Sequence, residues 1–470
     1  MKNRMIPEVL ALAVMAGILS AQPQPQTGAT RPDPKEIPVP PIATAERAMP
    51  GVDKLPNRPE MPDVLTMRNG KKVTTAEQWK RRREEMKQIL DYYAVGQAPP
   101  PPGNVKGHEI SSQLVLEGKV KYRLVHLTFG PRESLALDIG IFTPVEGGPV
   151  PTLISPSGSP PGAPALPRLA QGPNQGRGED VLLMVGAAPA AAAQAAPKAP
   201  PKAGKKAPGG PRTAESIAAA NPAIVHGFAL VTFNNNDCGE DTTLRSADGS
   251  WAFRTTRFYP AYPKYDWGLL QGWAWGVSRI VDYLETDPSI DKTKLIVTGV
   301  SRTGKSALVA GAFDDRLAMV APVASSGGGT PAYRFSGAER GGKEGLTEMM
   351  RKYPNWFSPH LHEFWGQPDK LPFDEHWFIA LAAPRPFIAL EGAQDQNVNA
   401  NGVRQAWLAA MPAFTLLHVA DRLGVSWADR PHGMVQGDWD ALLAFADKHL
   451  LGKTVNRQFD QFPKELFAAQ

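Results

Sequence analysis

The chain has 470 residues and a formal charge of +5, with 42% hydrophobic and 21% charged residues, as in ordinary globular proteins. One segment, residues 186–212, holds basic residues equal in number to the whole positive excess and contains no acid: Lys198, Lys202, Lys205, Lys206 and Arg212. The rest of the chain is therefore close to neutral, which gives no electrostatic reason to expect nucleic-acid binding.

The N-terminus predicts export. Lys2 and Arg4 precede an apolar run over residues 9–19 and then the small residues Ser20 and Ala21, the order found in secretory signal peptides. We expect a signal peptide over residues 1–21 and a periplasmic or secreted protein. No later segment approaches the ~18 apolar residues of a membrane span, so no membrane attachment is expected after cleavage. A single cysteine, Cys238, leaves stability to the core rather than to disulfides.

The first 150 residues change character along their length. Residues 22–59 are rich in proline and aperiodic, which predicts a disordered lead-in. A helix is expected next, starting at the capping box Thr74–Glu77 and ending at Gly96. Two strand-like segments follow, over 119–129 and 136–143.

From residue 151 onward, short apolar strands alternate with amphipathic helices. The expected strands are 152–155, 228–233, 295–298, 319–323 and 387–390, and the expected helices are 267–284, 305–313, 373–383 and 436–451. This alternation predicts a three-layer α/β fold, with a mainly parallel central sheet and helices on both faces. We expect one domain over residues 60–455, with an Ala/Pro/Lys-rich flexible insertion at 186–212 and a C-terminal tail at 456–470.

The most informative segment is Lys294–Leu308, which places Ser301 at a tight turn between an apolar strand and a helix. This is the pattern of a nucleophile elbow, in which a strained turn lifts a serine hydroxyl above the sheet edge of an α/β-hydrolase fold. The usual pattern is G-x-S-x-G. Here Gly299 is in place, but Thr303 stands at the second glycine and Gly304 comes one residue late.

The same segment also fits a nucleotide-binding loop, because Gly299–Ser306 matches G-x-x-x-x-G-K-S. Three observations favour an esterase. A phosphate-binding loop normally follows an early strand of its domain, whereas this one lies in the second half of the chain. The strand at 319–323 is followed by no aspartate for Mg²⁺. An exported protein also meets little nucleotide.

A serine nucleophile needs a histidine base and an acid that orients the histidine. In this fold they follow the serine in the order acid, then histidine. Among nine histidines, His432 lies in a loop just before the last expected helix. Asp395 follows the strand at 387–390, where catalytic groups gather, and Glu391 is a nearby rival. The sequence therefore predicts Ser301, Asp395 and His432 as the catalytic triad.

No metal or organic cofactor is expected. His360 and His362 are separated by one residue, but no third ligand follows at a spacing typical of a metal site.

Several stretches together carry a family pattern. Gly299–Lys305 reads G-V-S-R-T-G-K. The other stretches are Met61–Leu65 with Gly70–Thr75, Asp266–Gly268 with Trp273–Gly276, Asn355–Phe357, Leu371–Asp374 and Ala383–Pro386. The chain thereby resembles the glucuronoyl esterases, carbohydrate esterase family 15, over roughly residues 61–452. The family pattern G-x-S-R-x-G-K accounts for the late glycine.

The resemblance implies hydrolysis of the ester of a glucuronic acid carboxylate, the linkage that joins glucuronoxylan to lignin alcohols. It implies that Ser301 attacks this ester and forms an acyl-enzyme, while Arg302 stabilises the tetrahedral oxyanion. Lys305 is implied to contact the sugar, and Glu344 to bind sugar hydroxyls.

The chain departs from the family at two places. Many members carry the triad acid in the segment that corresponds to residues 324–329, which hold no carboxylate here. Asp395 matches the later loop from which other members supply it. Asn397 stands where that loop often has a tryptophan packed on the sugar, which bears on the substrate more than on the reaction.

Other functions stay open at this point. The nearest is an esterase of the same fold acting on an acetylated polysaccharide or an aryl ester. A nucleotide-binding protein and an inactive sugar-binding module are the alternatives from other classes. We expect a monomer.

Overall fold

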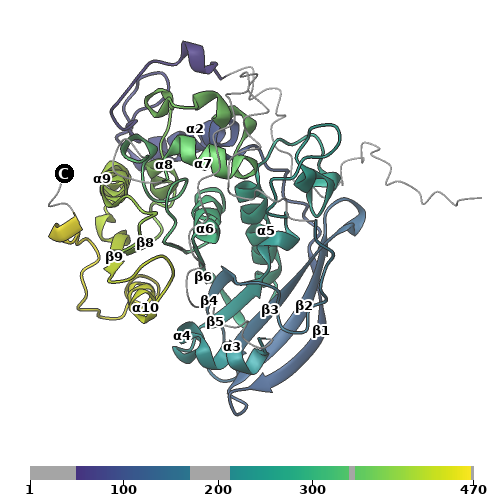
Figure 1. Cartoon of the computed structure of the whole chain (residues 1–470). Helices are drawn as coiled ribbons and strands as arrows, with labels where there is room; N and C mark the ends of the chain where they lie inside the picture. Colours follow the sequence, from purple (N-terminus) through teal and green to yellow (C-terminus); the bar gives the residue numbers. More distant parts are fainter. Residues whose placement is uncertain (1–48, 170–211, 338–343, 467–470) are drawn as a thin grey trace, which may run out of the picture.

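The computed structural model describes residues 49–169, 212–337 and 344–466 (Figure 1). The predicted signal peptide at 1–21 lies outside these residues, as does the predicted insertion except for Arg212.

The domain is built on one sheet with strand order β1-β2-β3-β5-β4-β6-β7-β8-β9. β1, β2, β3 and β5 pair antiparallel, and every pair from β5 through β4 to β9 is parallel. The strands are β1 (Lys106–Val115), β2 (Val120–Phe129), β3 (Leu135–Pro144), β4 (Val150–Pro156), β5 (Ala229–Phe233), β6 (Ile290–Val300), β7 (Met319–Val323), β8 (Phe387–Gly392) and β9 (Leu423–Ala428). A mainly parallel sheet of this kind confirms the predicted fold class.

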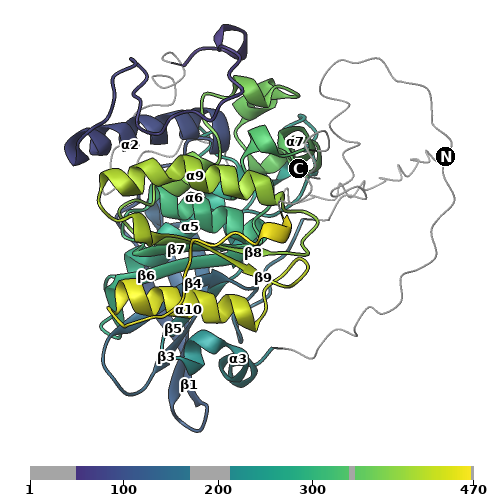
Figure 2. The same cartoon turned by 90° about the vertical axis from the view of Figure 1, so that its left-hand side faces the viewer.

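Helices cover both faces of the sheet. They are α2 (Ala76–Leu90), continued by the π-helical turn η2 (Asp91–Val95), α3 (Ala214–Ala220), α4 (Pro222–Val225), α5 (Leu269–Leu284), α6 (Arg302–Phe313), α7 (Leu346–Lys352), α8 (His376–Ala380), α9 (Ala400–Leu416) and α10 (Gln436–Leu450). Figure 2 shows α5, α6 and α9 on one side of the sheet, with α2 beyond them, and α3 and α10 on the other side.

Two cores follow from this arrangement, one on each face. Along β6, Leu295 and Val297 belong to the core under α5 and α6, whereas Ile296 between them belongs to the core under α10. Because successive side chains of a strand point to opposite faces, a strand covered on both sides has to be apolar at every position. This is why the central strands are recognisable in the sequence as short continuous apolar runs.

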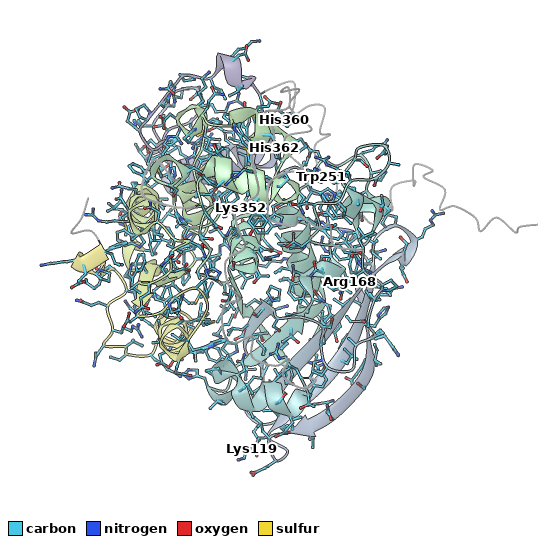
Figure 3. All side chains as sticks on the ribbon, in the orientation of Figure 1. Lys119, Arg168, Trp251, Lys352, His360 and His362 are labelled. Carbon is cyan, nitrogen blue, oxygen red and sulfur yellow. The ribbon has the colours of Figure 1, made fainter. Side chains whose placement is uncertain are left out.

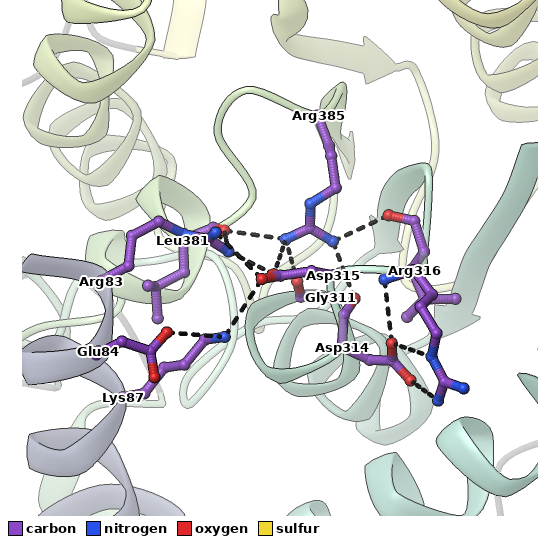
Figure 4. Close-up of polar contacts among 10 residues, drawn as sticks. Arg83, Glu84, Lys87, Gly311, Asp314, Asp315, Arg316, Leu381 and Arg385 are labelled. Atoms are coloured by element: carbon purple, nitrogen blue, oxygen red, sulfur yellow. Dashed lines mark hydrogen bonds and ion pairs between the residues drawn. The ribbon is translucent and has the colours of Figure 1, made fainter. Parts of the chain in front are cut away.

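The C-terminal end of α6 is fixed by a polar network that also holds α2 (Figure 4). Arg385 donates hydrogen bonds to the carbonyl oxygens of Gly311, at 2.7 Å, and Leu317, at 2.9 Å. Asp315, just past α6, forms an ion pair with Arg83 of α2 and lies 3.6 Å from the ammonium of Lys87. The helix that follows Ser301 is thereby anchored at its far end.

The predicted disordered lead-in is wrong for its last residues, Met49–Pro59. The Arg58 N–H donates to the carbonyl oxygen of Asp369 at 2.7 Å, and the Arg58 carbonyl accepts from Arg334 at 3.0 Å. This part of the segment is irregular but packed, because its backbone groups find partners on the domain. Proline-rich sequence indicates irregular structure and does not by itself exclude packing.

The predicted C-terminal tail is also part of the domain in its described portion, residues 456–466. The Val425 N–H of the edge strand β9 donates to the Phe459 carbonyl at 2.6 Å. The Phe459 ring is 6% exposed and lies 4.9 Å from the Phe445 ring, centroid to centroid. The tail thus covers an edge that would otherwise present unpaired backbone groups.

We expect Phe459→Ala to lower the free energy of unfolding by about 3 kcal/mol, because it leaves a cavity against α10. The exposed neighbour change Gln461→Ala should cost less than about 0.5 kcal/mol. Chemical denaturation of both variants checks this. Equal, small effects would mean that the tail does not contribute to the fold.

Candidate active site

Ser301 occupies a one-residue turn between the last residue of β6, Val300, and the first residue of α6, Arg302. Its backbone angles are φ 60° and ψ −122°, a conformation that non-glycine residues rarely adopt. The turn is held on both sides. The Ser301 N–H donates to the Val323 carbonyl of β7 at 2.9 Å, and the Ser301 carbonyl accepts from the Lys305 N–H at 3.0 Å. This is the geometry expected of a nucleophile elbow.

The two glycines of the segment are required by close packing at this turn. A Cβ on Gly299 would lie 2.5 Å from the Thr303 carbonyl oxygen. A Cβ on Gly304 would lie 2.8 Å from the Gly299 carbonyl oxygen and 2.9 Å from that of Val323. The late glycine is therefore the residue at which the first turn of α6 meets β6 and β7.

The same geometry excludes the nucleotide-binding alternative. A phosphate-binding loop needs several free backbone N–H groups between strand and helix, whereas here a single residue, Ser301, separates them. Lys305 is 2% exposed. Its ammonium donates to the Ser325 carbonyl and, at 2.9 Å, to the Ser326 hydroxyl. Two of its three donors are therefore engaged by the turn after β7.

The structure brings Asp395 and His432 together, although 36 residues lie between them in the chain. His432 Nδ1 lies 2.6 Å from Asp395 Oδ2. Asp395 follows β8 and His432 follows β9, so both stand at the carboxyl edge of the sheet, as does Ser301 after β6. With Nδ1 engaged by the carboxylate, Nε2 is the ring nitrogen that can accept a proton.

Hydrogen bonds keep Asp395 ionised despite its surroundings. Its side chain is 0% exposed, and burial alone raises the pKa of a carboxyl group. The hydrogen bonds from His432 and from the Asn397 N–H, at 3.0 Å, outweigh burial and lower the pKa of Asp395 below its ordinary value. An ionised, buried carboxylate against Nδ1 is what orients a histidine base.

Glu391, the rival acid, has the opposite environment. It is fully buried, and one carboxyl oxygen accepts from the Thr330 hydroxyl while the other has no hydrogen-bond partner within the described structure. Burial raises the pKa of Glu391 to about 8, so the carboxyl group is mostly protonated at neutral pH. A neutral carboxyl cannot stabilise a histidinium ion as Asp395 can.

Arg430 is a positioning residue that the sequence does not reveal. Its guanidinium is 2% exposed and donates to both carboxylate oxygens of Asp438 in α10, at 2.6 and 3.0 Å. It also donates to the Leu390 carbonyl of β8 at 3.2 Å, and its own carbonyl accepts from the Gln394 N–H at 3.0 Å. Arg430 therefore ties the loop of His432 to the loop of Asp395. In the sequence, the only sign of this arrangement is an acid eight residues after Arg430, Asp438.

Two cationic side chains follow Ser301 on the first turn of α6. Arg302 and Lys305 lie over the ring of Trp356, with the Arg302 Cζ 5.5 Å and the Lys305 Nζ 5.8 Å from its centroid. Arg302 also forms an ion pair with Asp241, a residue that sequence reasoning missed. Burial lowers the pKa of Lys305 to about 8.

Glu344 lies close to the turn after β7. A Cβ on Gly327 of that turn would lie 2.1 Å from the Glu344 carbonyl oxygen, so the two backbones touch. One carboxylate oxygen of Glu344 is 3.6 Å from the ammonium of Lys352, which Figure 3 labels. Glu344 also acts electrostatically on Lys305, favouring its charged form. The predicted sugar-binding residues thus belong to one electrostatic neighbourhood.

The two histidines considered for a metal have separate partners. His360 Nδ1 lies 3.0 Å from Glu363, and His362 Nε2 lies 3.0 Å from the Pro354 carbonyl (both histidines are labelled in Figure 3). Within residues 49–169, 212–337 and 344–466, no group of three His, Cys, Asp or Glu side chains is placed to hold a metal ion. None of the helices in these same ranges is long and apolar enough to cross a bilayer.

Residues 206–417 match the family described as glucuronyl esterase, fungi. A carbohydrate esterase from an unknown prokaryotic organism is 28% identical over 414 residues, which cover 83% of this chain and 90% of the relative. The 4-O-methyl-glucuronoyl methylesterase of Hypocrea jecorina is 27% identical over 422 residues, with coverages of 87% and 74%.

Two solved structures extend the similarity. A promiscuous carbohydrate esterase family 15 enzyme from a marine bacterial metagenome has a TM-score of 0.65 and 26% identity, covering 85% of this chain and 98% of its own. A family 15 glucuronoyl esterase from Caldicellulosiruptor kristjansonii has a TM-score of 0.61 and 25% identity, with coverages of 87% and 96%.

Asp395→Asn should lower kcat for ester substrates by about 10⁴, because an amide holds the histidine in the wrong tautomer. The control is Glu391→Gln, which replaces a mostly neutral acid by a neutral amide of the same shape and should be nearly silent at pH 7. Steady-state kinetics of both variants decides. A loss below tenfold for Asp395→Asn with a large loss for Glu391→Gln would exchange the two roles.

Proposed function

The chain is a relative of the carbohydrate esterase family 15 glucuronoyl esterases, and we propose that it hydrolyses glucuronoyl esters, such as those joining glucuronoxylan to lignin, through a serine acyl-enzyme. The observation that carries this proposal is the elbow. Ser301 stands at a strained turn, with Arg302 and Lys305 on the first helical turn after it and the Asp395–His432 pair at the same sheet edge.

In this proposal Ser301 Oγ attacks the ester carbonyl carbon while His432 Nε2 takes the hydroxyl proton. Asp395 stabilises the histidinium ion that forms. Arg302 places a fixed positive charge near the oxyanion of the tetrahedral intermediate. His432 then gives its proton to the departing alcohol oxygen. Water, activated by the same histidine, attacks the acyl-enzyme and releases the glucuronate with Ser301 restored.

Lys305 and Glu344 are proposed to bind the sugar. Both side chains suit a sugar ring, because an ammonium donates hydrogen bonds to ring hydroxyls and a carboxylate accepts hydrogen bonds from them. Asn397 lies two residues after Asp395 and replaces an aromatic platform by a small amide. This difference favours a second candidate, an esterase of the same mechanism with a broader range of esters, including acetylated polysaccharides and aryl esters.

The first residues of the chain bear on the cellular location of the protein. We propose export to the periplasm or the medium, because residues 1–21 have the pattern of a signal peptide. The proposed catalytic unit is a monomer whose substrate is a glucuronic acid ester of a polysaccharide.

The purified protein should hydrolyse benzyl glucuronate with a higher kcat/KM than 4-nitrophenyl acetate, and Ser301→Ala should abolish both activities without loss of fold. Release of benzyl alcohol, together with a circular dichroism spectrum of the variant, measures this. Preference for the acetyl ester would favour the broader esterase. Turnover that survives in Ser301→Ala would end the nucleophile assignment.

The lowered pKa of Lys305 predicts a pH effect on substrate binding. Its ammonium is cationic below about pH 8 and loses its charge above it, so KM for benzyl glucuronate should rise as the pH passes from 7 to 9. In Lys305→Arg the cation stays charged throughout this range, and the rise should disappear. If the same rise persists in Lys305→Arg, another group is responsible.

A further inference from the structure

We propose that Asp241 is the counter-ion of Arg302 and that its negative charge keeps the site from retaining its own anionic product. The inference rests on the proposed function, because the product of a glucuronoyl ester is a carboxylate, whereas the substrate is neutral at that group. Asp241 lies in the segment after β5, 60 residues before Ser301.

Both carboxylate oxygens of Asp241 are engaged. Oδ2 forms the ion pair with Arg302 Nη1, and Oδ1 accepts the indole N–H of Trp356 at 2.8 Å. The backbone N–H of Asp241 donates to the Asn236 side chain at 2.9 Å. The Asp241 side chain is 8% exposed, against 44% for Arg302. The carboxylate is thus fixed and largely removed from water, while the guanidinium it holds faces the solvent side.

Trp356 completes the support of Arg302. The guanidinium lies over its ring, and the ring is itself stacked on Tyr353 with centroids 3.9 Å apart and planes 6° from parallel. The guanidinium of Arg302 is therefore held both by a charge and by an aromatic face. A long side chain held in this way loses less freedom when it meets the oxyanion than a free one does.

The charge of Asp241 acts differently on the transition state and on the product. When Ser301 attacks, the new oxyanion appears together with a histidinium ion on His432, so the reacting groups carry no net charge. After hydrolysis the acid proton leaves to solvent, His432 is neutral again, and the bound glucuronate carries a full negative charge. A fixed negative charge nearby therefore weakens product binding more than it weakens the transition state.

Without Asp241, the guanidinium of Arg302 would meet the product carboxylate without a counter-ion. At the effective dielectric constants typical of partly exposed sites, a nearby unit charge changes the affinity for an anion on the order of tenfold. The Asp241 side chain therefore has two effects: it positions Arg302, and it favours release of the acid product.

The test compares two inhibitors, D-glucuronate and methyl glucoside, which share the sugar ring but differ in charge. Asp241→Asn is nearly isosteric and keeps an oxygen that can accept the Trp356 N–H. We expect the inhibition constant of glucuronate to fall about tenfold in this variant, and that of methyl glucoside to change less than twofold. kcat for benzyl glucuronate should fall as well, because the acid leaves more slowly.

Two further variants control for indirect effects. Asp237→Asn removes an acid of the same segment that pairs with Arg168, 2.6 Å away, and should leave both inhibition constants unchanged. Asp241→Glu keeps the charge and should keep the wild-type ratio of the two constants, even if its geometry lowers kcat. The assays are run with 4-nitrophenyl acetate as reporter, so the ratio does not depend on which ester is the natural substrate.

The inference is overturned if Asp241→Asn weakens both inhibitors equally or leaves the ratio unchanged, because the carboxylate would then act only on structure. It is also overturned if Asp241→Glu shifts the ratio as Asp241→Asn does. A wild-type protein that hydrolyses 4-nitrophenyl acetate but not benzyl glucuronate would instead overturn the proposed substrate, a result visible before any variant is made.

Discussion

The junction of β6 and α6 is the constraint on which the site depends. Ser301 is forced into a left-handed conformation because no other residue separates strand from helix. Such strain persists only where the surroundings over-determine it. Here Gly299 and Gly304 let the backbones approach, and the Arg385 network fixes the far end of α6. The same turn that holds Ser301 also begins the helix that carries Arg302 and Lys305, so the serine and the two cations have one structural origin.

Around this turn, burial and hydrogen bonding give similar carboxyl groups different properties. Asp395 and Glu391 are four residues apart and both buried. Donors to Asp395 lower its pKa, whereas Glu391 accepts one hydroxyl and has its pKa raised. Asp241 uses its charge to hold a cation. The partners of these three acids, rather than their residue type, therefore determine their different properties.

The fold could be predicted where sequence patterns are local. β4, β5, β7, β8 and the second half of β6 contain short apolar runs, and the family pattern around Ser301 identifies both the elbow and its late glycine. Sequence analysis predicts neither β1 nor β9. β1 is exposed along nearly all its length, so it has no alternation of apolar residues, and in β9 glycine and serine separate the apolar residues, so they form no continuous apolar run. α9 was missed as well, because Pro412 interrupts its helical pattern.

The predicted helix at 373–383 is wrong in extent, since α8 covers only His376–Ala380. The triad candidates could be named from chain order, because α/β-hydrolases place their catalytic groups after particular strands. The sequence does not show that three further residues belong to this site: Asp241, Arg430 and Trp356. Their contacts join residues far apart in the chain: Asp241 and Arg302 are 61 residues apart, Arg430 and Leu390 are 40 apart, and Trp356 and Asp241 are 115 apart.

The central claim is that Ser301 is the nucleophile of an esterase, and covalent labelling tests it most directly. A fluorophosphonate reacts with a serine only where a base activates it, and digestion followed by mass spectrometry locates the adduct. We expect one phosphonylated serine, Ser301, with esterase activity lost in parallel with the gain of label over time. Complete inactivation with the adduct on another residue, or full activity after Ser301 has been modified, would contradict it.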